Sequence, residues 1–290
     1  MKRTLTGLAW VSPWLVGFIA FMALPIAMSV YYSFTDYTLL EDPVWIGAGN
    51  YRRLAADPVF WIVLKNTVIF AAITIPAITV LALGVAGLMN MKVRGVGVFR
   101  TAVYIPFLVP TVASAMIWLW LYNSELGLVN QSLRAVGLPG PNWLGDRAWA
   151  MPAIILMNLW IILGPPVTIY IAAMQDVPRA VLEAAALDGM GPIRRFMHVT
   201  LPMISPLILF NVITTAINSW QVFAVPYIMT EGGPDRATYF YTMYLYDSAF
   251  TFQQMGYASA MAWVLFLLIL GMTGLLFLAA RRVVFERGGG

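Results

Sequence analysis

Residues 183–202 read EAAALDGMGPIRRFMHVTLP, a polar stretch within a chain that is otherwise largely apolar. Hydrophobic residues make up 61% of the 290 residues, and charged residues make up only 10%. A soluble domain of this length would need far more charge on its surface, so the composition predicts a polytopic membrane protein. The polar stretch is then a connection between spans, and its charge and helical pattern predict a partner in the cytoplasm.

Six apolar runs are long enough to cross about 30 Å of hydrocarbon, which takes roughly 20 helical residues. The run after Lys2 and Arg3 extends well beyond the core of a signal peptide and shows no clean cleavage site, so we expect a retained first span. The chain should therefore be an all-α polytopic membrane protein with six transmembrane helices in one transmembrane domain, residues 1–290. The predicted spans are 8–34, 66–91, 101–122, 148–174, 201–229 and 257–280.

Basic residues alternate between the connections, and short cytoplasmic connections are those that retain Lys and Arg. On the opposite side, basic residues such as Arg134 and Arg236 are offset by acidic ones such as Glu125 and Asp235. Both termini are therefore expected inside, and the formal net charge of +4 requires no nucleic-acid partner. The side predicted to be cytoplasmic carries Lys2, Arg3, Lys92, Arg94, Arg100, Arg179, Arg194, Arg195, Arg281, Arg282 and Arg287.

The predicted spans contain no Asp, Glu, Lys, Arg or His. Ionisable groups inside a bilayer usually mark proton relays or ion sites, so the sequence offers no carrier for proton-coupled transport. The chain has no cysteine, which excludes disulfides and thiolate chemistry. His198, the only histidine, lies in the polar stretch, where a solvated or helix-end role is expected and no metal or catalytic site is predicted.

The fourth and fifth predicted spans carry polar and helix-breaking residues. Pro165 and Pro166 each lack an amide donor, so they predict a kinked or opened helix. Asn218 and Gln221 are three residues apart and are expected to share a helix face. Amides beside aromatic rings suit a sugar, but the same groups could instead hydrogen-bond across helices as packing contacts. The hypothetical substrate pathway comprises Asn158, Gly164, Asn218, Ser219, Trp220, Gln221 and Tyr227.

A short helix is predicted at the start of the polar stretch, with Pro178 as its first residue and Gly189 just past its end. The eleven residues from Pro178 to Asp188 give about 16 Å, too short to span, so the helix should lie along the membrane surface. Residues 184–186 are all alanine, which favours a thin helix able to enter a groove. A surface helix without a partner is the alternative.

Several motifs in residues 178–202 match a known pattern. Glu183-Ala184-Ala185, Asp188-Gly189, Phe196 and the terminal Leu201-Pro202 occur at its spacing. The segment therefore resembles the EAA loop of permease subunits of binding-protein-dependent ABC importers. Met190 stands where that family usually has alanine.

A second motif narrows the resemblance. Residues 230–234 read TEGGP and Thr238 follows, which resembles the T-x-G-G-P loop of carbohydrate-uptake permeases, specifically the first subunit of maltose-type and glycerol-phosphate-type importers. Further matches that extend it over most of the chain are GNY at 49–51, FW at 60–61, NT at 66–67 and GLVN at 127–130.

The resemblance implies a type I ABC importer permease fold in a bacterial or archaeal cytoplasmic membrane. The implied partners are a homologous second permease subunit, two cytosolic ATPase subunits, an extracytoplasmic solute-binding protein and the sugar. Gly232, Gly233 and Pro234 would contact the binding protein, and Glu183 and Asp188 would orient the coupling loop by hydrogen bonds. The residues implied in ATPase coupling are Glu183, Ala184, Ala185, Asp188 and Gly189.

The chain has no G-x-x-x-x-G-K-[ST] pattern, so it should not be an enzyme or bind a cofactor; ATP and Mg would be bound by the partner ATPases. A charged substrate would favour basic residues in the pathway. Their absence from the spans favours a neutral mono-, di- or oligosaccharide, with glycerol phosphate or another non-sugar solute as the alternative. A secondary transporter would show coupling residues or internal symmetry, and a membrane enzyme would show a catalytic cluster; neither is seen.

Overall fold

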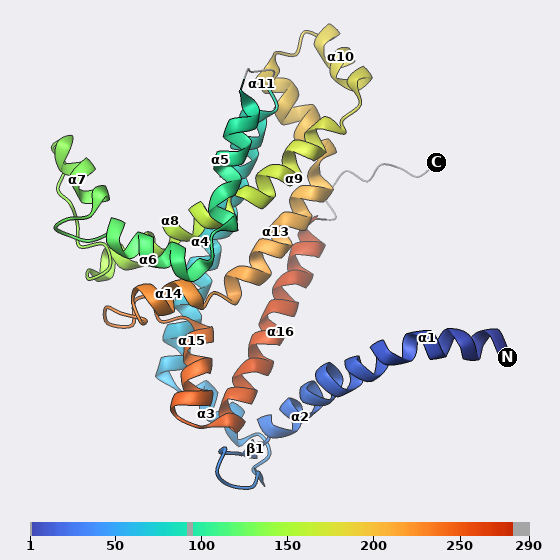
Figure 1. The fold of residues 1–290 in the computed structure, drawn as a ribbon, viewed down its shortest axis with the longest axis vertical. Coiled ribbons are helices and arrows are strands. Elements are labelled where there is room, and N and C mark those ends of the chain that lie inside the picture. The colour runs from blue at the N-terminus through green and yellow to red at the C-terminus, as the bar shows by residue number, and fades with distance from the viewer. Residues whose placement is uncertain (1, 92–94, 281–290) are drawn as a thin grey trace. The chain divides into compact units, whose positions relative to one another are not determined.

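The computed structural model describes residues 2–91 and 95–280, with side chains from Trp10 onward. Apart from one pair of two-residue strands, the regular elements within these ranges are helices (Figure 1). Contacts divide the chain into two compact units. The first takes residues up to Trp61 together with 244–268, and the second takes 62–243 together with residues from Ile269 onward.

Several of the basic residues used to predict the orientation lie outside the described part of the chain. The side chains concerned are those of Lys2, Arg3, Lys92, Arg94, Arg281, Arg282 and Arg287.

The first unit begins with the predicted first span. It consists of α1 (Lys2–Phe18), the π-helical turn η1 (Ile19–Ala23) and α2 (Leu24–Ser33). The strands β1 (Thr35–Asp36) and β2 (Val44–Trp45) then pair antiparallel and lead to α3 (Gly49–Ala56). From α3, the buried side-chain amide of Asn50 donates hydrogen bonds to the carbonyl oxygens of Ser33, at 3.1 Å, and Thr35, at 2.8 Å. These two bonds fix the end of α2 and the start of β1 against α3.

Asp57 lies between α3 and α4 (Pro58–Met89) and joins several parts of the first unit. Its carboxylate accepts hydrogen bonds from the hydroxyls of Tyr244, in α15 (Tyr241–Tyr246), and Tyr257, in α16 (Met255–Ala280), the latter at 2.7 Å. The Val59 backbone N–H donates a third, at 2.8 Å. Partial burial acts to raise the pKa of Asp57, but these hydrogen bonds to the charged form outweigh it and hold the pKa below its ordinary value.

In the second unit, the predicted span 101–122 is not one straight helix. It consists of α5 (Val96–Leu108) and α6 (Thr111–Leu121), which are bent by 101° across Val109 and Pro110. Proline disfavours helical backbone in the residue before it, and Val109 is accordingly extended, with ψ 131°. The predicted third span is therefore a bent helix pair, and the bend itself was not predicted.

The predicted fourth span consists of α8 (Arg147–Ile162) and α9 (Gly164–Gln175), bent by 48° at Leu163. The two prolines lie in the first turn of α9, where a missing amide donor costs no internal hydrogen bond, so the predicted kink is confirmed.

The fifth predicted span, 201–229, is divided among α12 (Leu201–Met203), α13 (Ser205–Trp220) and α14 (Ala224–Met229). The helical stretch 192–203 meets α13 at a bend of 71°. The 16 residues of α13 give about 24 Å, less than the bilayer core. The division of this predicted span into three helices was not predicted from the sequence.

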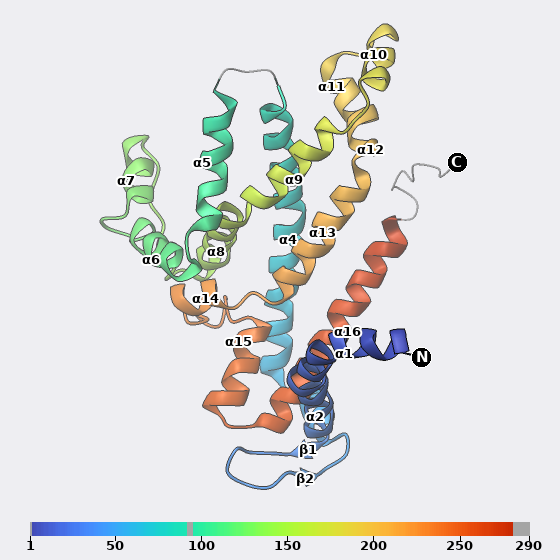
Figure 2. The ribbon, with the colours of Figure 1, turned by 45° about the vertical axis from the view of Figure 1, so that its right-hand side comes forward.

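Three helices, Trp10–Ser33, Pro58–Met89 and Met255–Ala280, are long and apolar enough to cross a membrane, and the number reaches six if each bent pair counts as one span. Figures 1 and 2 place α10 and α11 at one end of the second unit and α6 and α14 at the other. The short elements are α7 (Leu128–Ala135), α10 (Arg179–Leu187), α11 (Pro192–Arg195), and the π-helical turns η2 (Phe196–Thr200) and η3 (Asp247–Thr251).

Candidate functional site

The coupling segment, residues 178–202, begins with α10. Pro178 is the N-terminal cap, so the helix starts one residue later than predicted. At the other end, Gly189 adopts a left-handed backbone with φ +78°. The Met190 N–H donates to the Ala185 carbonyl and the Gly189 N–H to the Ala186 carbonyl, both at 3.1 Å. This pair of bonds is the Schellman cap that a glycine past the helix end permits, as the sequence predicted.

Glu183, Ala184 and Asp188 are exposed, whereas Ala185 is buried. Neither carboxylate makes a side-chain hydrogen bond or ion pair with another residue in the described ranges. Within the described chain, the segment is therefore ordered by its backbone cap, and the carboxylates of Glu183 and Asp188 remain available to accept hydrogen bonds from a partner.

Two large apolar side chains of the coupling segment project into solvent. Leu187, the last residue of α10, is 90% exposed, and Ile193 in α11 is 79% exposed. Neither was predicted from the sequence, because both lie in a stretch marked by its charges. The available signal was an aliphatic residue on each side of the predicted helix end at Gly189.

The coupling segment is fixed to the membrane helices through other apolar residues. Leu182, Phe196 and Leu201 pack against a buried cluster from α4 and α9 that includes Ala82 and Tyr170. The Phe196 ring lies 3.4 Å from the position that a Cβ on Gly87 would take, so the absence of a side chain there lets η2 approach α4. A displacement of the segment would therefore be passed directly to α4 and α9.

A cavity of about 470 Å³ lies within the second unit, among α4, α5, α8, α9 and α13. No charged residue is among those of the described chain that line it. The lining residues are Phe70, Phe107, Asn158, Ile162, Pro165, Pro166, Ile169, Phe210, Asn211, Thr214, Thr215, Asn218, Ser219 and Val222.

The cavity presents carboxamide groups beside apolar and aromatic walls. Asn218 donates one hydrogen bond to the Thr214 carbonyl, at 2.9 Å, and Asn211 donates one to the Leu207 carbonyl, at 3.2 Å. Each keeps a second amide hydrogen and its oxygen for other partners. Asn158 makes no hydrogen bond to any other residue that the structure describes. These groups can both donate to and accept from hydroxyls.

Three predicted pathway residues, Asn158, Asn218 and Ser219, line this cavity. Gly164 lies outside it, at a contact between helices where an added Cβ would stand 2.9 Å from the Cα of Tyr104. Gln221 follows the last residue of α13 and has φ −107°, so it does not continue the helix face of Asn218 as predicted.

The remaining two predicted pathway residues also lie outside the cavity lining. Trp220 is buried, and the Tyr227 ring stacks on Phe223 with ring centroids 5.0 Å apart.

The GGP loop, residues 230–240, is anchored by side chains. The Asn66 amide donates to the carbonyls of Arg236, at 2.8 Å, and Tyr239, at 3.0 Å. The Thr238 hydroxyl donates to the Gly233 carbonyl, at 2.6 Å. Gly232 has φ +87°, and a Cβ there would stand 2.8 Å from the Tyr239 ring. Gly233 and Pro234 remain partly exposed at the tip of this braced loop.

In the part of the chain that the structure describes, three long apolar helices, three bent apolar helix pairs and a cavity without charged lining residues are the features of a multi-pass membrane transport subunit. The family model described as "Binding-protein-dependent transport system inner membrane component" matches residues 78–285, and the chain belongs to this family. The protein is therefore a membrane component of a binding-protein-dependent ABC importer, as the two sequence motifs indicated.

Relatives of similar length match nearly the whole chain. The lactose transport system permease protein LacF of Rhizobium radiobacter is 36% identical over 95% of this chain and 94% of its own. The probable ABC transporter permease protein YesP of Bacillus subtilis is 34% identical over 95% of this chain and 90% of its own.

A solved structure confirms the predicted fold class. The crystal structure of a bacterial ABC transporter involved in the import of the acidic polysaccharide alginate contains a chain that matches with a TM-score of 0.85. The match covers 98% of each chain at 21% identity.

Proposed function

We propose that this chain is one of two permease subunits of an ATP-driven importer for a neutral sugar. The observation that carries the proposal is the uncharged, amide-bearing cavity formed by the broken helices of the second unit. Side-chain amides can bond to sugar hydroxyls, and Phe70, Phe107 and Phe210 offer flat apolar surface to the C–H faces of a sugar ring. The name of the relative LacF, a lactose permease, supports the same substrate class.

The cavity chemistry favours a neutral cargo over an acidic one. A carboxylate or phosphate is recognised best by Arg, Lys or a helix N-terminus, and no Arg or Lys is among the described residues that line the cavity. The alginate importer takes an acidic polysaccharide, but at 21% sequence identity the similarity supports a shared fold and not a shared substrate. Glycerol phosphate is disfavoured for the same reason.

The coupling segment is the proposed docking element for one of the two cytosolic ATPase subunits, which would bind ATP and Mg. Its exposed Leu187 and Ile193 offer apolar anchors, and the carboxylates of Glu183 and Asp188 are available to a partner. The attachment of Phe196 to α4 would transmit ATPase closure to the bent helices, which would alternate between inward-open and outward-open states.

The GGP loop is the proposed contact for an extracytoplasmic solute-binding protein, through the partly exposed Gly233 and Pro234; the predicted contact residue Gly232 is buried against Tyr239 and would instead shape the loop. It lies in the second unit at the end of α14, whereas the coupling segment lies at the other end (Figure 2). This separation agrees with an orientation in which the coupling segment is cytoplasmic and the GGP loop is extracytoplasmic. A homologous second permease subunit would complete the substrate pathway.

Hydrolysis of ATP by the complete complex, reconstituted with its binding protein, tests the proposal. The panel contains neutral sugars together with their phosphates and the corresponding uronic acids. Only the neutral sugars should stimulate ATP hydrolysis. Stimulation solely by charged or non-sugar solutes would refute the substrate class and leave the importer intact. Hydrolysis that responds to no binding protein would refute the transport mechanism itself.

A further inference from the structure

A second cavity of the second unit, about 520 Å³, lies between α5 and α9 and has a different chemistry. We propose that this α5–α9 groove binds one anionic phospholipid, with its headgroup at Arg100 and an acyl chain along the two helices. The lining residues are Arg100, Thr101, Val103, Tyr104, Ile105, Leu108, Gly164, Val167, Thr168, Ile171, Ala172 and Gln175.

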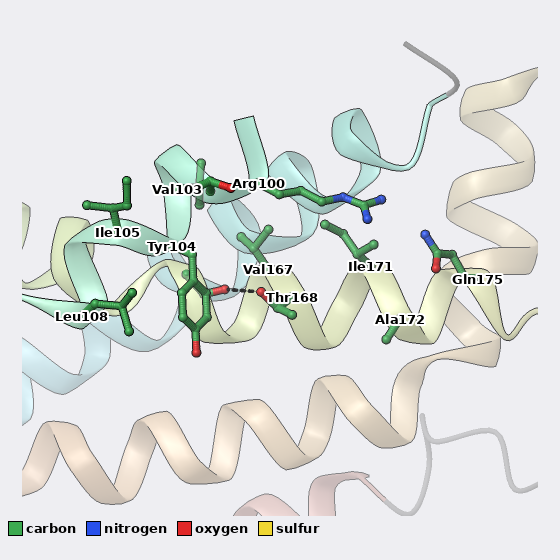
Figure 3. A pocket seen from close by; sticks show the side chains of 12 residues that line it. Arg100, Val103, Tyr104, Ile105, Leu108, Val167, Thr168, Ile171, Ala172 and Gln175 are labelled. Carbon is green, nitrogen blue, oxygen red and sulfur yellow. Dashed lines mark hydrogen bonds between the residues drawn. The ribbon is translucent and has the colours of Figure 1, made fainter. Parts of the chain in front are cut away.

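The groove is polar at one end and apolar along its length. Figure 3 shows Arg100 and Gln175 together at one end, with Ile105 and Leu108 at the other. The hydroxyls of Thr101 and Thr168 donate to carbonyls of their own helices, those of Gly97 and Gly164, both at 3.1 Å. Because these two donors are already used, the Tyr104 hydroxyl is the main polar group left in the body of the groove, whose other walls are largely aliphatic and suit a hydrocarbon chain.

The charge of the groove is unbalanced. Arg100 is exposed, and within the described ranges it makes no ion pair or side-chain hydrogen bond. No Asp or Glu is among the described residues that line the groove. A guanidinium paired with no carboxylate is a complementary site for a phosphodiester, which it can bind through two parallel N–H···O bonds.

The dimensions match one leaflet of a bilayer. From Gly164 to Gln175, α9 rises about 16 Å, close to half of the roughly 30 Å hydrocarbon thickness. At the deep end, Gly164 lets α9 approach the backbone of Tyr104, which closes the groove there. A lipid with its phosphate at Arg100 would therefore extend its chain to about the bilayer midplane. This placement rests on the proposed orientation, in which Arg100 lies at the cytoplasmic interface.

The test measures lipids retained by the complete permease–ATPase complex after exchange into nanodiscs of phosphatidylglycerol and phosphatidylethanolamine, followed by release into detergent and native mass spectrometry. R100Q should lower the ratio of retained phosphatidylglycerol to phosphatidylethanolamine by about fivefold, the factor that corresponds to about 1 kcal/mol per basic residue at an anionic surface. A172F, which fills the groove without changing charge, should lower retention of both lipids. R147Q, at an exposed arginine outside the groove, is the matched control and should behave as wild type.

Wild-type retention in both R100Q and A172F would overturn the proposal. Loss of the second permease subunit from A172F, with unchanged lipid retention, would instead identify a protein segment as the occupant and would equally overturn it. The measurement involves neither sugar nor ATP, so its outcome is independent of the substrate proposed above.

Discussion

The coupling segment and the GGP loop are both loops at the ends of the second unit, yet they are held in opposite ways. The first is shaped by backbone bonds around Gly189, and its carboxylates and Leu187 point outward. The second is braced by the side chains of Asn66 and Thr238. In the coupling segment, the backbone holds the shape, so the side chains are available to contact a partner. In the GGP loop, side chains hold the shape, so mainly backbone and a proline are available for contact.

The largest effect on the coupling segment should come from Gly189→Val, which should reduce coupled transport. A side chain in the left-handed region costs about 1–2 kcal/mol, and no other residue in the described part of the chain lies within 4 Å of the added Cβ. Since 2 kcal/mol corresponds to about thirtyfold, a loss of coupled transport greater than about thirtyfold would exceed the backbone cost and reveal a contact with the ATPases. Gly191→Val is the matched control, because that glycine has φ −63° and an equally open position. Normal coupled uptake by the Gly189 variant would contradict the coupling role.

On the opposite side of the comparison, Asn66→Ala should disorder the GGP loop. It leaves the carbonyls of Arg236 and Tyr239 without their donor, at a cost of about 1–3 kcal/mol. Stimulation of ATP hydrolysis by the binding protein should fall about tenfold while basal hydrolysis persists. Gln131→Ala removes an exposed amide bonded within the α7 region and should leave stimulation unchanged. Equal losses in both variants would show that the brace has no special role.

Between the two loops, Asn158→Leu and Asn218→Leu test the cavity. Each removes a group that can bond to a sugar hydroxyl, worth about 1 kcal/mol, so the KM for uptake should rise about fivefold. Gln221→Leu changes an amide outside the cavity and should have no such effect. The KM values are measured from uptake kinetics in proteoliposomes. Equal KM values in all three variants would show that the asparagines serve in helix packing and do not bind the sugar.

The smallest expected effect belongs to a second side-chain brace, Asp57. Its pKa is lowered in the folded protein, so its stabilising contribution is present above the ordinary carboxyl value of about 3.9 and is lost as the pH falls through the lowered pKa. Because the carboxylate is only partly buried, Asp57→Asn should cost less than about 1 kcal/mol at pH 7. Thermal unfolding should show a Tm difference that shrinks below pH 4; a difference that grows there would reverse the assigned sign.

Local sequence patterns predicted the features that depend on local chemistry. Gly189 past a helix end and the prolines at 165 and 166 act on their own backbone, so the cap and the kink could be predicted directly. The bend at Val109 and Pro110 was missed because both sides of it are apolar, and composition carries no information on direction. The proline itself was the overlooked signal.

The candidate site was predictable only in part, because its members come from distant parts of the chain. Asn158 and Asn218 line one cavity, whereas Gln221 lies outside it because α13 ends at Trp220. The hydropathy of the sequence does not mark this helix end. Asn66 stands 170 residues before Arg236, the carbonyl partner it braces. Only the fold brings such pairs together. Residues 66–67 could therefore be matched to the family pattern from the sequence, but the role of Asn66 in holding the GGP loop could not be predicted.

The backbone cap at Gly189 also bears on how such a subunit could change its partners over evolutionary time. Since the turn is closed by main-chain atoms, residues such as Glu183, Leu187 and Asp188 can be replaced without rebuilding it. Docking shape and docking chemistry are thereby separated: a single glycine preserves the first, and a handful of surface side chains sets the second. A permease built in this way can be adapted to a different motor by small steps, each of which leaves the loop intact.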